Sequence, residues 1–221
     1  MSTRMTVAVN AGFVAGGFAL AVALYSRLPA LVPVHFAVGG EADRFAEKPW
    51  GAFELPVVLA AVGALFLLLP RRSPRGFRMD RFAGGYQAIA TAAIGFLFVA
   101  CAATLLSAAG YPVDQRRVVG LGLGALMVVI GNYMGKLRRN FYVGIRTPWT
   151  LASEAVWERT HRFGGPLFVA AGVVAMALAL LSRSLAPAVG VVVAAALIAS
   201  AYSYLVHRRL EQHLPEDPDP T

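Results

Sequence analysis

The chain has 221 residues, of which 57% are hydrophobic and only 14% are charged. Soluble domains carry about a quarter charged residues, so this composition excludes an ordinary soluble domain and indicates an integral membrane protein. The formal net charge is +8, but the arginines lie between apolar stretches, which is typical of membrane topology rather than of direct nucleic-acid binding. The one cysteine, Cys101, excludes an intrachain disulfide and a cysteine-cluster metal site.

Six apolar stretches are each long enough to cross a bilayer, which takes roughly 17–25 residues. They predict an all-α polytopic membrane protein with six transmembrane helices. Small residues recur within these stretches and favour close helix packing, while Asn10, Gln87 and Asn132 are expected to face the interior of the bundle. The predicted spans are 6–26, 53–70, 84–109, 118–135, 165–182 and 186–206.

Lysine and arginine are concentrated in alternate connecting segments, and the positive-inside rule places these segments in the cytoplasm. Both termini are then cytoplasmic, with one loop outside and one basic loop inside. The first stretch also resembles a signal peptide ending at Ala21-Val22-Ala23, but its length favours a retained helix. We divide the chain into a two-span region over 1–83 with the outer loop 27–52, a four-span region over 84–207 with the inner loop 136–164, and a disordered acidic tail over 208–221.

The outer loop is rich in residues that break helices and set turns, including Pro33 and Gly40. We expect a folded loop that lies on the outer membrane surface. His35 and Asp43 have the residue types of metal ligands, but their spacing matches no metal signature. Half-buried packing for His35 and an ion pair of Asp43 with Arg44 or Lys48 are the more ordinary interpretations.

The inner loop contains the dense polar sequence GIRTPWTLASEAVWERTH, over 144–161. Thr147 is a good N-cap and Pro148 is tolerated at the first helical position. These residues predict a short amphipathic helix over about 148–162, which ends at Gly164-Gly165. Trp149 and Trp157 are expected to dip into the membrane interface, so that the helix lies on the inner surface.

The same helix carries residue types that could do chemistry. Glu158 and His161 form a Glu-x-x-His pair, but carboxylate-bridged metal sites need a second such pair, and the chain has none. Ser153 and His161 lie about two helical turns apart, too far for a nucleophile and its base. We therefore assign no catalytic residue, metal or cofactor, and keep as the weaker alternative a metal held by His35, Asp43, Glu158 and His161.

Two stretches together resemble a known family. Asn140 to Leu151 reads NFYVGIRTPWTL, followed by Trp157, Thr160 and His161, and this is similar to the signature of the SdpI family of bacterial membrane proteins. The outer stretch resembles a domain of unknown function that precedes the signature in many members. Its matching residues are Leu28, Pro29, Pro33, His35, Gly40, Asp43 and Lys48.

The resemblance implies a multi-pass protein of the bacterial plasma membrane. The best-known family member is an immunity protein against a secreted toxic peptide, and it also holds a transcriptional repressor at the membrane. Our leading hypothesis is an immunity or sensor protein without catalysis. Its outer loop would meet an extracellular peptide, and its inner loop would meet a repressor or stabilise the bundle. One alternative is a membrane-embedded metal-dependent hydrolase or lipid-modifying enzyme, based on the polar cluster of Arg146, Thr147, Glu158, Thr160 and His161. Another is a small-molecule or lipid transporter.

Overall fold

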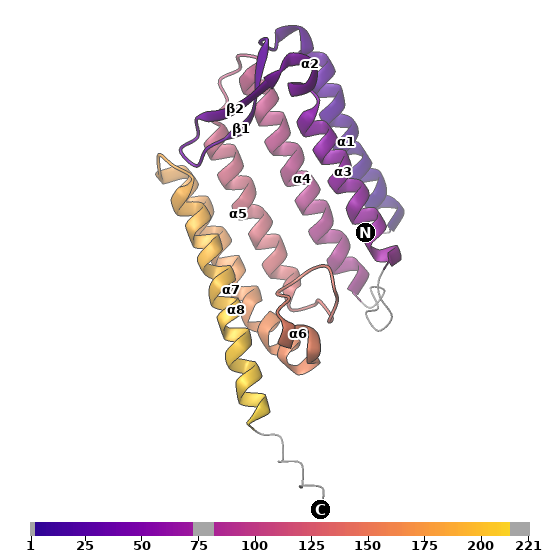
Figure 1. Cartoon of the computed structure of the whole chain (residues 1–221), viewed down its shortest axis with the longest axis vertical. Coiled ribbons are helices and arrows are strands. Elements are labelled where there is room, and N and C mark those ends of the chain that lie inside the picture. Colours follow the sequence, from indigo (N-terminus) through magenta and orange to yellow (C-terminus); the bar gives the residue numbers. More distant parts are fainter. Residues whose placement is uncertain (1–2, 73–81, 213–221) are drawn as a thin grey trace, which may run out of the picture.

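The computed structural model describes residues 3–72 and 82–212, and within these residues six helices are long and apolar enough to cross a membrane. They lie side by side as one elongated bundle (Figure 1). The six predicted spans are confirmed in number and order. The helices are α1 (Thr3–Leu24), α3 (Glu54–Leu68), α4 (Ala83–Ala108), α5 (Gln115–Met134), α7 (Glu154–Leu181) and α8 (Ala186–Glu211).

The shorter elements gather at the two ends of the bundle. One end, called here the hairpin end, carries β1 (Leu31–Phe36) and β2 (Ala42–Glu47), with the short helices η1 and α2 beside them. The other, the signature end, carries α6 (Pro148–Ala152), and α1 begins and α8 ends there (Figure 1). The remaining bounds are η1 (Tyr25–Arg27), α2 (Lys48–Gly51) and η2 (Leu69–Arg72).

The predicted folded outer loop is an antiparallel two-stranded hairpin. Val32 and Val34 point inward and are buried, whereas the strand residues between and beside them are more exposed, which is the alternation of a half-buried strand. Val32 is fully buried in a core cluster with Ala21 of α1 and Leu105 of α4. Pro33 is tolerated because β1 has a neighbouring strand on one side only.

Close contact between α5 and α7 depends on glycine. A Cβ atom at Gly172 of α7 would lie 2.5 Å from the Gly124 carbonyl oxygen of α5, and one at Gly131 would lie 2.6 Å from the Gly165 carbonyl oxygen. The two backbones therefore touch at two levels, with no room for any larger residue. In a lipid environment such close approach of small residues is a main source of helix association.

The helix predicted over 148–162 is wrong in its extent. The chain forms α6, breaks at Ser153, and then runs as one continuous helix, α7, through Gly164, Gly165 and Pro166. Ser153 starts α7 because its hydroxyl accepts a hydrogen bond from the Val156 amide. The glycines do not end the helix, because they are buried against α5 and Met134.

Two further expectations about polar residues are settled by the structure. Gln87 faces α1, where it contacts Thr3 and Thr6, but Asn132 is exposed on the bundle surface and the prediction for it is wrong.

Helix α8 continues to Glu211, so the first residues of the predicted tail are helical. The rest of that tail, over 213–221, lies outside the described residues.

Gly131→Ala is expected to lower the stability of the bundle by about 1–3 kcal/mol, because the added methyl group forces α5 away from the α7 backbone. Thermal unfolding of the purified protein in detergent measures this change. The matched control is Gly190→Ala on α8, where nothing lies within 4 Å of the new Cβ, and where alanine should be neutral or stabilising. Equal melting temperatures for both variants would refute the glycine contact.

Candidate functional site

The signature loop is folded around the fully buried side chain of Asn140. Its Oδ1 accepts hydrogen bonds from the Tyr142 and Val143 amides, both at 2.8 Å. Its Nδ2 donates to the Arg138 and Val143 carbonyl oxygens, both at 2.9 Å. The two donor hydrogens and the two acceptor lone pairs of the amide thus all bond to backbone groups of its own loop. Asn140 therefore sets the shape of the loop.

His161 joins this loop to α7. Its Nε2 accepts a hydrogen bond from the Ile145 amide at 3.0 Å. The proton of the neutral ring therefore sits on Nδ1, which donates to the Trp157 carbonyl oxygen at 2.8 Å. The Trp157 ring stacks on His161 with 3.9 Å between centroids. Gly144 has φ of 123° and a Cβ there would overlap His161, so only glycine fits this position without strain.

The start of α6 joins the same loop to α8. Thr147 and Thr150 form a capping box, each accepting a hydrogen bond from the other's backbone amide. The Trp149 indole nitrogen donates to the Ser203 hydroxyl of α8 at 2.7 Å, and its ring stacks against His207. Loop, α7 and α8 are therefore locked together by side chains from all three.

The structure brings most of the predicted signature residues into this one assembly, and their role there is structural. Trp157 is completely buried and its indole donates to the Leu137 carbonyl oxygen, so its predicted place at the membrane interface is wrong. Thr160 is buried in the same helix. Arg146 and Pro148 lie on the exposed surface, where the Arg146 guanidinium donates to the Phe141 carbonyl oxygen.

The weaker metal alternative receives no support from the geometry. Both ring nitrogens of His161 are engaged by the backbone, and Glu158 pairs with Arg138. His35 and Asp43 belong to the hairpin end instead. Over residues 3–72 and 82–212, no three His, Cys, Asp or Glu side chains come together as a metal-binding group.

At the hairpin end, the predicted outer residues shape the hairpin itself. His35 Nδ1 and Asp43 Oδ1 lie 2.6 Å apart across the two strands. The turn between the strands contains Gly40 at φ of 98°, a left-handed conformation that favours glycine. Lys48 lies with its Nζ 4.9 Å from the centre of the Tyr25 ring. These are surface contacts, and they correct two expectations: His35 is exposed rather than half-buried, and Asp43 pairs with His35 rather than with Arg44 or Lys48.

The hairpin tip is also tied to the second half of the chain. The Val38 carbonyl oxygen accepts hydrogen bonds from the Leu185 amide at 2.8 Å and from the Ser184 hydroxyl at 3.0 Å. Both donors lie in the turn between α7 and α8. Arg44 of β2 also forms a 2.6 Å ion pair with Glu54 at the start of α3. The hairpin therefore bridges the mouth of the bundle.

Beneath this bridge lies a cavity of about 210 Å³ between the hairpin and α3, α4 and α5. We call it the hairpin cavity; its apolar wall includes Leu59, Leu97 and Ala100, and its rim includes His35 and Gly40. Two of its lining residues, Gln115 and Arg116, each carry a buried polar atom without a hydrogen-bond partner in the described part of the chain. These are Gln115 Oε1, an acceptor, and Arg116 Nε, a donor.

Local charge at this cavity is set by the start of α5. Asp114 caps the helix by accepting a hydrogen bond from the Arg117 amide at 3.1 Å, and this bond, together with Arg116 and Arg117, lowers the pKa of its carboxyl group. The Arg116 and Arg117 guanidinium groups lie 3.3 and 3.2 Å from the one carboxylate. Two positive charges thus face a single negative one, leaving the cavity edge cationic.

Sequence reasoning missed Gln115 and Arg116, although Asp114 ahead of an apolar stretch was a visible helix-start signal. It also missed Ser203, which looks in the sequence like an ordinary small residue of a transmembrane helix. The hairpin cavity is lined by His35 and Gly40 of the outer motif and, among the described residues, by none of the signature residues.

The family is decided by comparison with known proteins. The model of the SdpI/YfhL protein family matches residues 136–206, and a domain of unknown function (DUF1648) matches residues 12–60. Immunity protein SdpI of Bacillus subtilis (strain 168) is 30% identical over 155 residues, which cover 70% of this chain and 72% of the relative. The chain belongs to the SdpI family. No solved structure matches it.

The residue ranges of the two family matches coincide with structural units of the bundle. The family model covers the signature loop with α7 and most of α8, which are the elements that Asn140, His161 and Ser203 lock together. The second match covers most of α1, the hairpin and the first half of α3. With six apolar helices and a bacterial SdpI relative, the chain is a multi-pass protein of the bacterial plasma membrane.

Asn140→Ala is expected to destabilise the protein by roughly 2–4 kcal/mol, because it leaves buried backbone groups of the loop without partners. Asn132→Ala is the matched control, since this asparagine is exposed and surface substitutions are usually worth less than about 0.5 kcal/mol. Thermal or denaturant unfolding in detergent compares the two. A loss of stability no larger for Asn140→Ala than for Asn132→Ala would contradict the structural role.

Proposed function

We propose that the protein is a membrane immunity protein, which protects the cell that makes it from a secreted toxic peptide. The SdpI relative carries the name immunity protein. The observation that carries the proposal to this chain is the hairpin cavity, whose lining residues Gln115 and Arg116 hold one acceptor and one donor that lack a partner in the described residues. By the distribution of positive charge, the hairpin end faces the cell exterior, which is the side from which such a peptide arrives.

The chemistry of the hairpin cavity fits a peptide. A peptide unit carries one N–H donor and one C=O acceptor, which are the complements of Gln115 Oε1 and Arg116 Nε. The apolar wall formed by Leu59, Leu97 and Ala100 suits an apolar side chain next to that unit. At about 210 Å³, the cavity is smaller than the roughly 300–1,000 Å³ of a site that encloses a whole small ligand. It therefore takes a single anchoring residue of the peptide.

Protection follows from occupancy rather than from catalysis. A peptide that is anchored by one residue under the hairpin is held at the outer surface and is withdrawn from the pool that inserts into the bilayer. The anchor is desolvated by the apolar wall, and buried anchors of this kind dominate the binding energy of peptide interfaces. The cationic edge at Arg116 and Arg117 adds attraction for an acidic residue or a C-terminal carboxylate.

A second part of the proposal concerns signalling at the signature end. There the cytoplasmic surface exposes Phe141 and Phe163 close in sequence to the exposed Arg146, Arg159 and Arg162. Exposed aromatic and arginine side chains are the residue types enriched at protein interfaces. This surface suits a cytoplasmic repressor protein held at the membrane after toxin binding.

Fluorescence microscopy of a tagged repressor of the host tests this part of the proposal. The repressor should move to the membrane in cells with the wild-type protein, but not in cells with Phe141→Ala. An unchanged distribution of the repressor in both strains would refute it.

The immunity function is tested by expressing the protein in a sensitive bacterium. Cells are challenged with the low-molecular-mass fraction of culture supernatant from the source strain. Wild-type protein is expected to raise the inhibitory dose by at least about tenfold, the effect of 1.4 kcal/mol in binding. Ala100→Leu, which fills the hairpin cavity, should return the dose to that of cells with empty vector.

Val99→Leu is the matched control, because Val99 precedes Ala100 on α4 but is exposed on the bundle surface. It should protect as well as the wild type. Both variants are checked for equal membrane levels and equal melting temperature. Equal protection by both variants would show that the hairpin cavity is not the binding site, and no protection by the wild type would refute the immunity function.

A further inference from the structure

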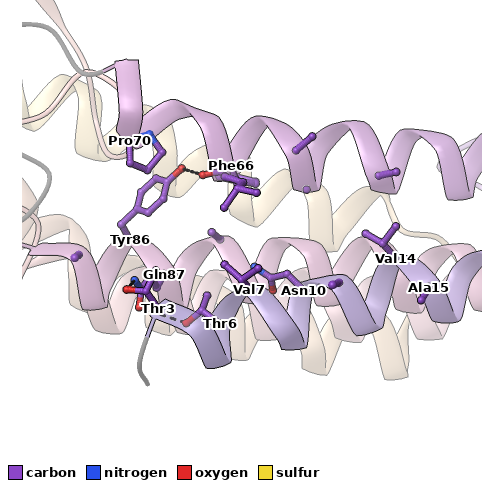
Figure 2. Close-up of a pocket in the computed structure, with 17 residues that line it drawn as sticks. Thr3, Thr6, Val7, Asn10, Val14, Ala15, Phe66, Pro70, Tyr86 and Gln87 are labelled. Atoms are coloured by element: carbon purple, nitrogen blue, oxygen red, sulfur yellow. Dashed lines mark hydrogen bonds between the residues drawn. The ribbon is translucent and has the colours of Figure 1, made fainter.

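The hairpin cavity differs in its cover from a second hollow of the bundle, a groove between α1, α3 and α4 (Figure 2). All the lining residues of the groove belong to helices. Two of these helices are tied directly to each other, because the Tyr86 hydroxyl of α4 donates to the Phe66 carbonyl oxygen of α3 at 2.6 Å, as Figure 2 shows. The hairpin cavity is instead covered on one side by two strands and their turn, which can move while the helices stay packed.

The polar atoms at the wall of the hairpin cavity are covered while the hairpin is in place. Gln115 Oε1 and Arg116 Nε are buried and have no hydrogen-bond partner among the described residues. Gly40 of the turn lies directly on the Arg116 side chain, since a Cβ atom at Gly40 would be 3.4 Å from the Arg116 Cβ. A ligand therefore reaches these two atoms only after the turn has moved.

The part of the hairpin nearest the helices is fixed. We call residues 31–33 and 45–47 the hairpin base and residues 36–42 the hairpin tip. In the base, Val32 is fully buried in a cluster with Ala52 and Leu105. Helix α2 packs on it so closely that a Cβ atom at Gly51 would lie 2.8 Å from the Val32 Cβ. Separating these apolar contacts would expose them to water, so the base stays packed.

Strand pairing is irregular where the base and the tip meet. The register shifts between Pro33 and His35, and again between His35 and Phe36. Such irregularities interrupt the ladder of hydrogen bonds and bend a strand locally. Bending at this point breaks fewer regular backbone bonds than bending within the base. The hinge for a motion of the tip against the base is therefore at His35.

The hairpin tip holds its own shape. Within it the Ala37 amide donates to the Glu41 carbonyl oxygen, and the Gly40 amide donates to the Ala37 carbonyl oxygen, both at 2.9 Å. These bonds are local to the turn and do not depend on the helices below it. The tip can therefore move as one unit.

Few polar contacts attach the tip to the rest of the described chain. The Val38 carbonyl oxygen accepts the hydrogen bonds from the Leu185 amide and the Ser184 hydroxyl, and we call this pair of bonds the latch. The Val38 side chain beside it is 56% exposed. Hydrogen bonds at an exposed site add little net stability, because water can replace both partners. The tip is thus the part of the hairpin that opens most readily.

We propose that the hairpin is a lid on the hairpin cavity, which opens at its tip by bending at His35 and is held closed by the latch. Opening lets a peptide backbone reach Gln115 and Arg116 from the cell exterior, and closing covers the anchored residue. Lids of this kind set the rates at which a ligand enters and leaves a site. The biological role of the lid rests on the immunity function proposed above, whereas the opening itself does not.

Cysteine labelling without any toxin tests the lid. Cys101 is the only cysteine of the chain and lines the hairpin cavity, yet it is 2% exposed. The purified full-length protein in detergent is treated with a maleimide that carries a trimethylammonium group, whose permanent charge keeps it out of hydrocarbon. Peptide mass spectrometry follows the modified fraction of Cys101 over time. Labelling is expected under conditions in which the protein remains folded.

A buried thiol elsewhere separates opening of the lid from unfolding of the protein. Ala195 of α8 is 3% exposed and lines neither the groove nor the hairpin cavity. Ala195→Cys in a Cys101→Ala background is therefore the matched control. Cys101 of the wild type should react at least about tenfold faster than this control thiol, because local opening is less costly than global unfolding. Equal rates for the two thiols, or no reaction at Cys101, would overturn the proposal.

Ser184→Ala weakens the latch by removing one of its two bonds. It should raise the labelling rate of Cys101 about fivefold, the typical effect of one hydrogen bond. Ser200→Ala is the matched control, because the Ser200 hydroxyl donates to the Ala196 carbonyl oxygen within α8, and it should leave the rate unchanged. The Ser184 hydroxyl also accepts from the Ala186 amide, so the two variants are compared after their melting temperatures are shown to agree. Equal labelling rates in the two variants would refute the latch.

A disulfide across the tip tests the lid in the opposite direction. The 3.4 Å between the Arg116 Cβ and a Cβ atom at Gly40 is close to the roughly 3.5–4.5 Å of a disulfide. In oxidised Gly40→Cys/Arg116→Cys protein, labelling of Cys101 should fall at least about tenfold, because local opening is blocked. The same protein after reduction is the matched control, in which labelling should return. Unchanged labelling in the oxidised protein would overturn the proposal.

The labelling and toxin experiments fail independently of each other. Opening of the lid in a protein that gives no protection would refute the immunity function and leave the lid in place. Protection by a protein whose Cys101 is never labelled would refute the lid and leave the immunity function in place.

Discussion

Water is absent from the interior of a bilayer, so polar groups at that depth need partners within the protein. This constraint explains why the signature loop is so rich in polar residues. The chain leaves helical geometry between α5 and α6 at the edge of the membrane, and the backbone groups freed there have to be paired. Asn140 pairs four of them, and His161 and Thr150 pair others. In this loop, side chains provide the backbone hydrogen bonds that a helix would otherwise provide.

The same constraint shapes the contact between α5 and α7. Since lipid chains are as apolar as leucine, burying leucine between helices gains little in a membrane, and close backbone contact takes its place. Gly124 and Gly131 on α5, with Gly165 and Gly172 on α7, provide that contact. It brings the start of α7 against the signature loop, where Trp157 and His161 fill the remaining space. The hairpin cavity lies elsewhere, between the hairpin and α3, α4 and α5.

Much of the architecture was predictable from the sequence, because span length and apolar composition are strong signals. The six spans, the folded outer loop and the helix start at Thr147 all follow from local rules. What local rules missed depends on tertiary contact. Gly164 and Gly165 look like a helix end, yet α5 packs against them and the helix continues. Trp157 looks like an interfacial residue, yet a loop covers it. The cavity residues Gln115 and Arg116 carry no signal until the hairpin is placed above them.

The hydrogen bonds from Leu185 and Ser184 to Val38 have a mechanical consequence. They attach the tip of the hairpin to the turn from which α7 and α8 both extend. At their far ends these two helices hold the signature loop through His161 and Ser203. The hairpin and the signature loop are thus attached to opposite ends of the same two helices. A tilt of α7 and α8 that is imposed at the hairpin therefore also moves the signature loop on the other side of the membrane, without any ligand crossing it.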